Sequence, residues 1–375
     1  MRLLVSGGGT GGHVYPILAV LRYLDEQNKS SQEICYVGNA SGIEAKLATQ
    51  AGLPFREITT ASFHGAAPWA IPSRLARLGR GTAQCVGIVD EFLPQAVLAT
   101  GGYVCAPPIL AAWIRKVPSV IYLPDVMPGL AVRTLGRCAT VVAVSFPRST
   151  GFFAPGKAVV TGYPVRKELF QIDKTASRAK LGLKQGEKTL LVLGGSQGAH
   201  SINLAVGAIL EDLLDVCQIL HISGQADVSW LRSRRDELPS AQAERYAVHP
   251  YLHEEIIDAL AAADLALARA GAATTGEFPA VGLPSILVPY PHAGRHQELN
   301  ADHMVDNNAA VKLADADLEK GVLRDTILGL LTDDVRLESL AEGARRLAQP
   351  SAAQRIADLL GEIARPNQPT QRGSS

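Results

Sequence analysis

Short apolar runs alternate with longer helical stretches along the whole chain. This alternation is typical of parallel α/β sheets, in which each buried strand is followed by a helix that crosses back over the sheet. We therefore predict an α/β protein with a strand at each apolar run. The predicted strands of the first half are Arg2–Ser6, Ile34–Val37, Ala96–Ala99, Ser119–Leu123 and Thr140–Val144, and those of the second half are Thr189–Leu193, Gln218–Ile222, Ala247–Val248, Leu265–Ala268 and Ser285–Val288.

A glycine-rich loop follows the first predicted strand of each half. The first loop is Gly7–Gly12, with the sequence GGGTGG, and the second is Gly194–Ala199, with the sequence GGSQGA. A buried strand that runs into such a turn and then a helix presents backbone N–H groups at the helix N-terminus, where phosphate can bind. Two such units in one chain predict two Rossmann-like, doubly wound domains that face each other across a cleft.

The composition indicates a soluble globular protein. Of the 375 residues, 47% are hydrophobic and 19% are charged, and 36 Lys and Arg balance 36 Asp and Glu. The chain is long enough for two domains of ordinary size. Its balanced charge gives no field that favours nucleic acid. The five cysteines are scattered and lack a CxxC pair, which favours reduced thiols in a cytosolic protein.

We expect no signal peptide at the N-terminus and no segment that spans a membrane. The N-terminus enters a strand at once, without the basic and long apolar regions of a signal peptide. No uninterrupted apolar run approaches the length of about 18 residues that a membrane span needs. The tail from Pro366 is rich in Pro, Gln, Ser and Gly, and we predict that it is disordered.

A basic amphipathic stretch, Ser62–Gly81, differs from the rest of the chain. It contains no acidic residue, and its apolar and basic side chains include Phe63, Trp69, Ile71, Leu75 and Leu78 with Arg74, Arg77 and Arg80. The leucines lie three residues apart and the arginines recur at the same spacing, which predicts a short amphipathic helix. Such a helix either lies on an anionic membrane surface or packs its leucines on its own domain.

The first glycine-rich loop also satisfies the GxGxxG pattern of dinucleotide-binding units. That function needs an acidic residue at the end of the second strand, where this chain has Gly38-Asn39. An enzyme that uses NAD or FAD is therefore not expected. The loop ends at His13, and the positive end of a helix favours a neutral imidazole, which suits a general base. The alternative is that His13 only caps the helix.

The second half carries an arginine and a carboxylate around a second strand–turn–helix unit. The run Arg269–Glu277 holds a turn with Gly271 and a helix with Thr274, so its N-terminus could meet a diphosphate. Glu277 could accept both hydroxyls of a ribose, or it could be a solvated acid at the helix dipole. The polar loop that follows ends with Gln297 and Asn300, which suit sugar hydroxyls.

Two patterns resemble metal sites only loosely. Asp315-Ala316-Asp317 matches the short DxD pattern of some sugar transferases, but three residues match by chance often. The aspartates also precede a polar helix, where they are ordinary caps. His249 and His253 are followed by acidic residues without the HExxH order. We expect no metal ion and no cofactor.

Five groups of motifs, in the same order, resemble the MurG family of glycosyltransferases. The resemblance runs from Arg2 to about Arg346. The motifs are Gly8–His13 followed by Pro16, Gly101–Val104, Gly194–Ala199, Arg269–Ala272 with Glu277, and Gly282–Pro289 followed by His296-Gln297 and Asn300-Ala301. Members of this family add N-acetylglucosamine (GlcNAc) to the lipid-linked muramyl-pentapeptide of peptidoglycan synthesis.

The resemblance implies the GT-B fold, with two Rossmann-like parallel-sheet domains. We expect an acceptor-facing and membrane-facing domain over 1–160 and a UDP-sugar-binding domain over 161–345. The Gly- and Pro-containing run Ala158–Phe170 is the expected hinge. A helix over 346–365 is expected to pack back on the N-terminal domain, before the tail over 366–375.

The resemblance also implies roles for individual residues. On the donor side, Glu277 would hold the ribose of UDP-GlcNAc and the backbone near Leu252 the uracil. The other implied donor-binding residues are Arg166, Ser196 and Thr274 at the diphosphate, Gln297 and Asn300 at the sugar, and Gln197, Gly271 and Ala272 in the same loops. The implied acceptor-side residues are Thr10, Gly11, Gly12, His13 and Tyr103. His13 would be the base for an inverting attack of the muramyl C4 hydroxyl on C1 of GlcNAc.

One segment departs from the family pattern. Where the family usually has His-Glu-Gln-Asn, this chain has Leu123–Met127, with the sequence LPDVM, before Pro128–Ala131. Only Asp125 is polar there, and our hypothesis is that it takes over part of the missing role by orienting His13. Because the resemblance implies that this segment faces the acceptor, a related enzyme with another UDP-sugar or lipid acceptor remains an alternative.

Two further alternatives come from other functional classes: a UDP-sugar-binding protein without turnover, and an epimerase of the same fold. An intact His13 argues against the first. An epimerase should place catalytic carboxylates in the cleft, where only Asp125 is a candidate. The expected partners are UDP-GlcNAc and the undecaprenyl-diphosphate-linked muramyl-pentapeptide, with no nucleic acid. The expected location is the cytoplasmic face of the cell membrane, reached peripherally through Ser62–Gly81.

Overall fold

The computed structural model describes residues 1–27, 33–62, 67–195, 197–292 and 295–365. Ser196 and the tail from Pro366, both subjects of sequence predictions, lie outside these residues. Contacts divide the chain into two compact units. Unit 1 contains Met1–Pro124, Pro128–Gly162 and the segment from Ser351, whereas unit 2 contains Asp125–Met127 and Tyr163–Pro350.

Unit 1 is built on a seven-stranded sheet with the order β3-β2-β1-β4-β5-β6-β7, in which all neighbouring strands are parallel. Its strands are β1 (Arg2–Ser6), β2 (Glu33–Gly38), β3 (Phe55–Glu57), β4 (Ala96–Ala99), β5 (Ser119–Leu123), β6 (Val141–Val144) and β7 (Ala158–Val160). Its α-helices are α1 (Gly11–Glu26), α2 (Ile43–Gln50), α3 (Ile71–Phe92), α4 (Ala106–Arg115), α5 (Leu130–Leu135) and α16 (Ala352–Ile363), with short 3₁₀ turns η1 (Pro68–Ala70), η2 (Tyr103–Cys105) and η3 (Pro147–Phe152).

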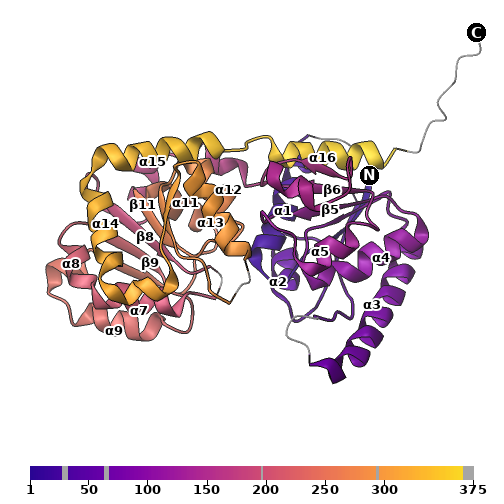
Figure 1. The fold of residues 1–375 in the computed structure, drawn as a ribbon, viewed down its shortest axis with the longest axis horizontal. Coiled ribbons are helices and arrows are strands. Elements are labelled where there is room, and N and C mark those ends of the chain that lie inside the picture. The colour runs from indigo at the N-terminus through magenta and orange to yellow at the C-terminus, as the bar shows by residue number, and fades with distance from the viewer. Residues whose placement is uncertain (28–32, 63–66, 196, 293–294, 366–375) are drawn as a thin grey trace, which may run out of the picture. The chain divides into compact units, whose positions relative to one another are not determined.

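The C-terminal helix α16 belongs to unit 1 although the chain reaches it through unit 2. It packs on α1 and on strands β4 and β5, and Figure 1 shows it in yellow beside α1. Arg355 in this helix donates a hydrogen bond from Nη1 to the carbonyl oxygen of Thr161 over 3.2 Å. The helix thereby covers β4 and β5, and β4 is the neighbour of β1, the strand that precedes the first glycine-rich loop.

Unit 2 is built on a six-stranded parallel sheet with the order β10-β9-β8-β11-β12-β13. Its strands are β8 (Thr189–Leu193), β9 (Gln218–Ile222), β10 (Tyr246–His249), β11 (Leu265–Ala268), β12 (Ser285–Leu287) and β13 (Ala310–Lys312). Its helices are η4 (Lys167–Phe170), α6 (Lys174–Lys180), α7 (His200–Ala208), α8 (Leu210–Leu214), α9 (Val228–Asp236), α10 (Ser240–Ala243), α11 (Ile256–Ala262), α12 (Thr274–Val281), α13 (His296–Asp306), η5 (Asp315–Lys320), α14 (Val322–Thr332) and α15 (Asp334–Leu347).

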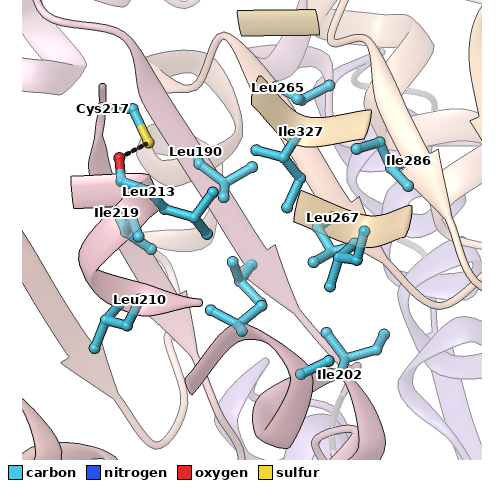
Figure 2. Packing of buried hydrophobic residues seen from close by; sticks show 14 of the residues in the cluster. Leu190, Ile202, Leu210, Leu213, Cys217, Ile219, Leu265, Leu267, Ile286 and Ile327 are labelled. Atoms are coloured by element: carbon cyan, nitrogen blue, oxygen red, sulfur yellow. Dashed lines mark hydrogen bonds between the residues drawn. The ribbon is translucent and has the colours of Figure 1, made fainter. Parts of the chain in front are cut away.

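Alternate residues of the central strands enter two separate cores, one on each face of the sheet. In β11, Leu265 and Leu267 join one hydrophobic cluster, whereas Ala266 and Ala268 join the other. Figure 2 shows the first cluster, where the strand leucines meet Ile327 of α14 and leucines of α8. Because both faces of the sheet are covered, the central strands are continuous apolar runs in the sequence, and they could be predicted for that reason.

The predicted α/β fold with two parallel, doubly wound sheets is confirmed, and all ten predicted strands occur. The prediction for the basic stretch was wrong in extent. The helix α3 begins at Ile71 and continues to Phe92, because Cys85, Ile88 and Val89 extend a buried face beyond Gly81. Residues 63–66 of that stretch lie outside the described part of the chain.

Candidate active site

The sheet registers bring the predicted site residues together within each unit. In unit 1, Ser6 of β1 pairs with Ala99 of β4, so the loops that follow these strands meet at one sheet edge. The predicted residues on these loops are Thr10, Gly11, Gly12, His13 and Tyr103. In unit 2, Leu193 of β8 pairs with Ala268 of β11 and with Ile222 of β9, and most of the predicted donor-side residues follow these strands.

His13 lies in the first turn of α1, with its ring held from its own helix. Its backbone N–H donates to the carbonyl oxygen of Thr10 over 3.1 Å. The Thr10 hydroxyl oxygen lies 3.1 Å from Nδ1 of the ring. The Thr100 hydroxyl donates to the carbonyl oxygen of His13. The base predicted from the sequence is therefore anchored both at its ring and at its backbone.

Two glycines of the neighbouring loop let the backbone approach this ring. Gly101 and Gly102 have φ angles of 80° and 75°, in the region that side chains rarely adopt. A Cβ on Gly101 would lie 3.4 Å from Nε2 of His13, and a Cβ on Gly102 would lie 2.9 Å from the carbonyl oxygen of Gly8. The GGYV motif thus brings Tyr103 next to the first glycine-rich loop.

A buried carboxylate, Glu44, lies behind the first glycine-rich loop, and sequence reasoning did not find it. Its two oxygens accept hydrogen bonds from the backbone N–H groups of Gly9 and Asn39, each over 3.2 Å. Glu44 lies in the first turn of α2, where an acid is ordinarily assigned to the helix dipole. The available signal was only that it follows the second strand within a few residues.

In unit 2, the second glycine-rich loop packs against the turn after β9. Gly198 has a φ of 83°, and a Cβ there would lie 2.3 Å from the carbonyl oxygen of Ser223. Gly224, with a φ of 82°, approaches Gln197 from the other side, since its Cβ would lie 2.6 Å from the carbonyl oxygen of Gln197. The conformation of the second glycine-rich loop, the predicted diphosphate loop, is therefore restricted by the turn after β9, which carries no predicted site residue.

A buried polar network supports the turn after β9, which contains Ser223 and Gly224. The amide nitrogen of Asn203 donates to the carbonyl oxygen of Ser223 over 2.8 Å and to Oδ2 of Asp227 over 2.7 Å. Its amide oxygen lies 2.9 Å from Nε2 of His221, so that nitrogen must carry the proton. Nδ1 of His221 then accepts from the Tyr246 hydroxyl over 2.8 Å. Burial lowers the pKa of His221 to about 3 and keeps the ring neutral.

Asp227 is the charged member of this network. Burial alone would raise its pKa, but hydrogen bonds from Trp230, Asn203 and His200 lower the pKa overall. Nδ1 of His200 lies 2.8 Å from Oδ1 of Asp227. The first residue of α7 is thereby joined to the start of α9, which fixes both helices that border the loop.

The N-terminus of α12 presents backbone N–H groups after β11, the neighbour of the strand β8 that precedes the second glycine-rich loop. Among the described residues, no protein group accepts the N–H of Gly271, Ala272 or Ala273. The Thr274 hydroxyl donates to the carbonyl oxygen of Gly271 over 2.7 Å and so stabilises the turn. A helix start with such N–H groups suits a diphosphate.

Glu277 lies in the first turn of α12 beside the segment that holds Arg166. A Cβ on Gly276 would lie 2.3 Å from Cδ1 of Tyr163, so only glycine lets the start of unit 2 pack on this helix. Burial raises the pKa of Glu277 above its ordinary value of 4.5, and the charge of Arg166 partly opposes the shift. Glu277 is thus a half-buried carboxylate with a cation nearby rather than a solvated acid.

Arg269 ties the α12 loop to the loop after β12. Its guanidinium forms an ion pair with Asp315 at 2.5 Å and donates to the Ser201 hydroxyl over 2.7 Å. Nη1 also donates to the carbonyl oxygens of Val288 and Pro289. The first aspartate of the DxD pattern is therefore a partner of Arg269. Among the described residues, no group of three or more metal-ligating side chains occurs.

The first two turns of α13 hold both the loop before it and the Asp125–Met127 segment. Oε1 of Gln297 accepts from the backbone N–H of Tyr290 over 2.8 Å. The fully buried Asn300 accepts from the N–H of Val126 over 3.1 Å and donates to Oδ1 of Asp125 over 2.9 Å. Its Nδ2 also donates to the carbonyl oxygen of Ala270 over 3.1 Å. Both N–H groups of this amide thus have partners within unit 2.

The 3₁₀ turn η1 and the start of α3 expose a group of large apolar side chains. Trp69 is 85% exposed, and Ile71 and Leu75 are also exposed. Figure 1 shows that this end of α3 extends away from α4. Within the part of the chain that the structure describes, no helix has the length and apolar character to cross a membrane.

Comparison with known proteins agrees with these features. The model of the glycosyltransferase family 28 N-terminal domain matches residues 3–144, and that of the C-terminal domain matches residues 189–356. The UDP-N-acetylglucosamine–N-acetylmuramyl-(pentapeptide) pyrophosphoryl-undecaprenol N-acetylglucosamine transferases of Roseiflexus sp. (strain RS-1) and Moorella thermoacetica are 41% and 38% identical. The alignments cover 96% of this chain with 94% and 98% of those proteins.

A solved structure shows the same fold. The crystal structure of Acinetobacter baumannii MurG matches with a TM-score of 0.73 and 27% sequence identity, over 96% of this chain and 99% of that chain. The chain therefore belongs to the MurG family within glycosyltransferase family 28.

Proposed function

We propose that this protein transfers GlcNAc from UDP-GlcNAc to the C4 hydroxyl of the undecaprenyl-diphosphate-linked MurNAc-pentapeptide, which converts lipid I into lipid II in peptidoglycan synthesis. It is a UDP-GlcNAc-dependent N-acetylglucosaminyltransferase of the MurG type. The observation that carries this proposal is the 41% identity to the Roseiflexus transferase over 96% of the chain. The names of the relatives identify the two substrates.

Unit 2 binds the donor in this proposal. The carboxylate of Glu277 accepts both ribose hydroxyls, and the backbone near Leu252 binds the uracil. The N–H groups at the start of α12 and the second glycine-rich loop, with Ser196, Thr274 and Arg166, bind the diphosphate. What supports this assignment is that Glu277 and the uncommitted N–H groups of Gly271–Ala273 lie on the same helix start.

Unit 1 binds the acceptor and supplies the base. The C4 hydroxyl oxygen attacks C1 of GlcNAc as the bond from C1 to the UDP oxygen breaks, which inverts the anomeric centre. His13 takes the hydroxyl proton, and the negative charge that develops on UDP is stabilised by the helix N-termini and Arg166. The hydrogen bond between Thr10 and Nδ1 of His13 supports this role, because it orients the ring.

The donor sugar lies at the start of α13 in this proposal, where Gln297 and Asn300 were predicted to bind it. Gln297 holds the loop at Tyr290, and Asn300 holds Asp125. We therefore assign Asn300 a second role, in which it fixes the segment that replaces the usual His-Glu-Gln-Asn of the family. The hypothesis that Asp125 orients His13 stays a prediction.

We further propose that the protein binds the cytoplasmic membrane face peripherally through the first turns of α3. Trp69, Ile71 and Leu75 would enter the lipid interface while Arg77 and Arg80 meet anionic headgroups. The exposure of Trp69 and Leu75 supports this over packing on unit 1. Flotation with anionic vesicles tests it: Trp69→Ala should weaken binding about tenfold, whereas Val335→Ala, an exposed apolar residue of unit 2, should not.

Product analysis tests the proposed activity. The full-length protein is incubated with UDP-GlcNAc and either a short-chain lipid I analogue or an undecaprenyl-phosphate lipid without the muramyl sugar, and products are identified by mass spectrometry. We expect a GlcNAc–MurNAc disaccharide on the lipid I analogue only. GlcNAc on the other lipid would instead favour the alternative acceptor, an altered free nucleotide sugar would favour an epimerase, and donor binding without any product would favour a binding protein.

A further inference from the structure

Glu44 is an acidic residue that unit 1 buries completely. Its side chain is 0% exposed, although acidic residues are rarely fully buried without a partner. Each of its two oxygens accepts one backbone hydrogen bond, from Gly9 and from Asn39. Hydrogen bonds to both oxygens offset part of the cost of removing a carboxylate from water.

Glycines enclose this carboxylate on two sides. A Cβ on Gly8 would lie 2.4 Å from Cδ of Glu44, and a Cβ on Gly42 would lie at the same 2.4 Å. The hydrogen bond to Gly9 reaches a residue with a φ of 86°, which only glycine adopts readily. The loop backbone and the carboxylate therefore fit each other closely.

The same carboxylate lies where a dinucleotide-binding unit holds its ribose. A Cβ on Gly38, at the end of β2, would lie 2.9 Å from Cγ of Glu44. The acid that the sequence lacks at the end of β2 is thus delivered from α2. Both oxygens of Glu44 already accept backbone hydrogen bonds, and no part of the side chain is exposed. Glu44 is therefore not accessible to a nucleotide.

The effect of Glu44 reaches His13 through two steps. Gly9 directly precedes Thr10, and both the carbonyl oxygen and the hydroxyl of Thr10 contact His13. A shift of Gly9 therefore moves the groups that orient the imidazole. We propose that Glu44 is a positioning residue: by holding the N–H of Gly9, it fixes Thr10 and thereby the orientation of the His13 ring. The kinetic part of this inference rests on the proposed function of His13.

Two variants displace Glu44 without altering His13 or Thr10. Gly42 has a φ of −84°, so alanine fits its backbone, and the three atoms nearest to the new methyl group all belong to the Glu44 carboxyl group. Glu44→Gln replaces one of the two acceptors with an amide that faces a backbone N–H. The matched control is Gly87→Ala in α3, where nothing lies within 4 Å of the added methyl group.

We expect Gly42→Ala and Glu44→Gln to lower kcat at least tenfold with the KM for UDP-GlcNAc within twofold, while Gly87→Ala behaves as wild type. In a His13→Ala background, Gly42→Ala should cause less than a twofold further loss, because the carboxylate acts through that ring. An equal loss in both backgrounds would overturn the proposal, since it would indicate a purely structural role.

A spectroscopic measurement reads the same effect without turnover. In full-length protein with isotope-labelled histidine, the His13 signals are assigned by their loss in His13→Ala. They should shift in Gly42→Ala and in Glu44→Gln and stay in place in Gly87→Ala. Unchanged His13 signals in both displacing variants would overturn the inference, whether or not the wild-type protein is active as a transferase. An inactive wild-type protein would by itself count only against the proposed function.

Discussion

Asn300 donates a hydrogen bond from Nδ2 to Oδ1 of Asp125 over 2.9 Å, although 175 positions separate the two residues. The same Asn300 accepts the N–H of Val126, and Nδ1 of His296 lies 3.0 Å from the carbonyl oxygen of Met127. Three consecutive residues are thus held by the first two turns of α13. This explains why Asp125–Met127 belongs to unit 2 while the residues on both sides belong to unit 1.

We predict that Asn300→Asp lowers both stability and kcat, because it places a second carboxylate against Asp125 in a buried position. The cost should be about 1–3 kcal/mol, as for other buried polar groups left without a suitable partner. Adding Asp125→Asn should recover part of the loss, since the new amide can donate to the carboxylate introduced on α13. Urea unfolding and initial rates of the two single variants and the double variant measure this coupling. Strictly additive losses would show that the two side chains do not act as a pair.

Glu277→Ala should raise the KM for UDP-GlcNAc about 100-fold, because the variant loses the two charge-assisted hydrogen bonds that we propose between Glu277 and the ribose. For the wild type, the donor KM should rise as the pH falls toward the pKa of Glu277, which lies above 4.5, because the protonated carboxyl group accepts hydroxyl protons less well. Glu277→Gln should flatten that pH dependence. Donor KM between pH 8 and 5 checks both, with Glu211→Ala as a surface control that should leave the KM unchanged.

His13→Ala should lower kcat about 100-fold to 10,000-fold, the range typical of a lost general base. The donor KM should change little, because the site proposed for UDP-GlcNAc lies in unit 2. Thr10→Val should give a smaller loss, since it removes only the hydroxyl that orients Nδ1. Steady-state rates with saturating donor provide the comparison. A His13→Ala variant with the kcat of the wild type would remove His13 from the role of base.

The buried His221 should make the protein lose stability as the pH falls below about 6. The unfolded chain binds a proton on this residue near its ordinary pKa of 6.5, whereas the folded chain does so only near 3. Between these values the unfolded state holds more protons, so stability decreases by about 1.4 kcal/mol per pH unit as the pH falls. The lowered pKa of Asp227 changes the stability only around and below its ordinary pKa of 3.8. Asp227 therefore does not contribute to this slope.

His221→Gln should remove most of that slope, because glutamine can replace the donor to Asn203 and the acceptor from Tyr246 without titrating. The part that remains comes from His249, because burial lowers its pKa too. Urea unfolding between pH 7 and 4 measures the free energy for both proteins. The exposed His253→Gln variant serves as the control and should keep the slope of the wild type. Equal slopes for wild type and His221→Gln would mean that another group controls the acid sensitivity.

The central strands could be predicted from the sequence, because both of their faces are buried and they appear as continuous apolar runs. Three strands were missed: β3, β7 and β13. Each has three residues and lies at a sheet edge, where fewer side chains are buried and the apolar signal is weak. The full length of α3 has a signal in the sequence, because the spacing of Cys85, Ile88 and Val89 fits a helix that continues past Gly81.

The motifs of the candidate site could also be located in the sequence, but the contacts that support them could not be predicted from it. Glu44 looks like any first-turn acid until the fold brings Gly8, Gly9 and Gly42 around its carboxyl group. Asn300 and Asp125 pair only because the folded chain brings Asp125–Met127 into unit 2, and no local sequence pattern predicts this. Such long-range hydrogen bonds form only after the sheets are assembled, so sequence spacing carries no information about them.

The most direct test of the proposed function is transfer of radiolabelled GlcNAc from UDP-GlcNAc to a short-chain lipid I analogue, measured with EDTA present. We predict that the wild-type protein forms a lipid-linked disaccharide at a rate that EDTA does not reduce, and that Glu277→Ala does so only at much higher donor concentration. Binding of UDP-GlcNAc without any transfer to the lipid I analogue would contradict the account, and transfer that requires an added divalent ion would contradict its metal-free chemistry.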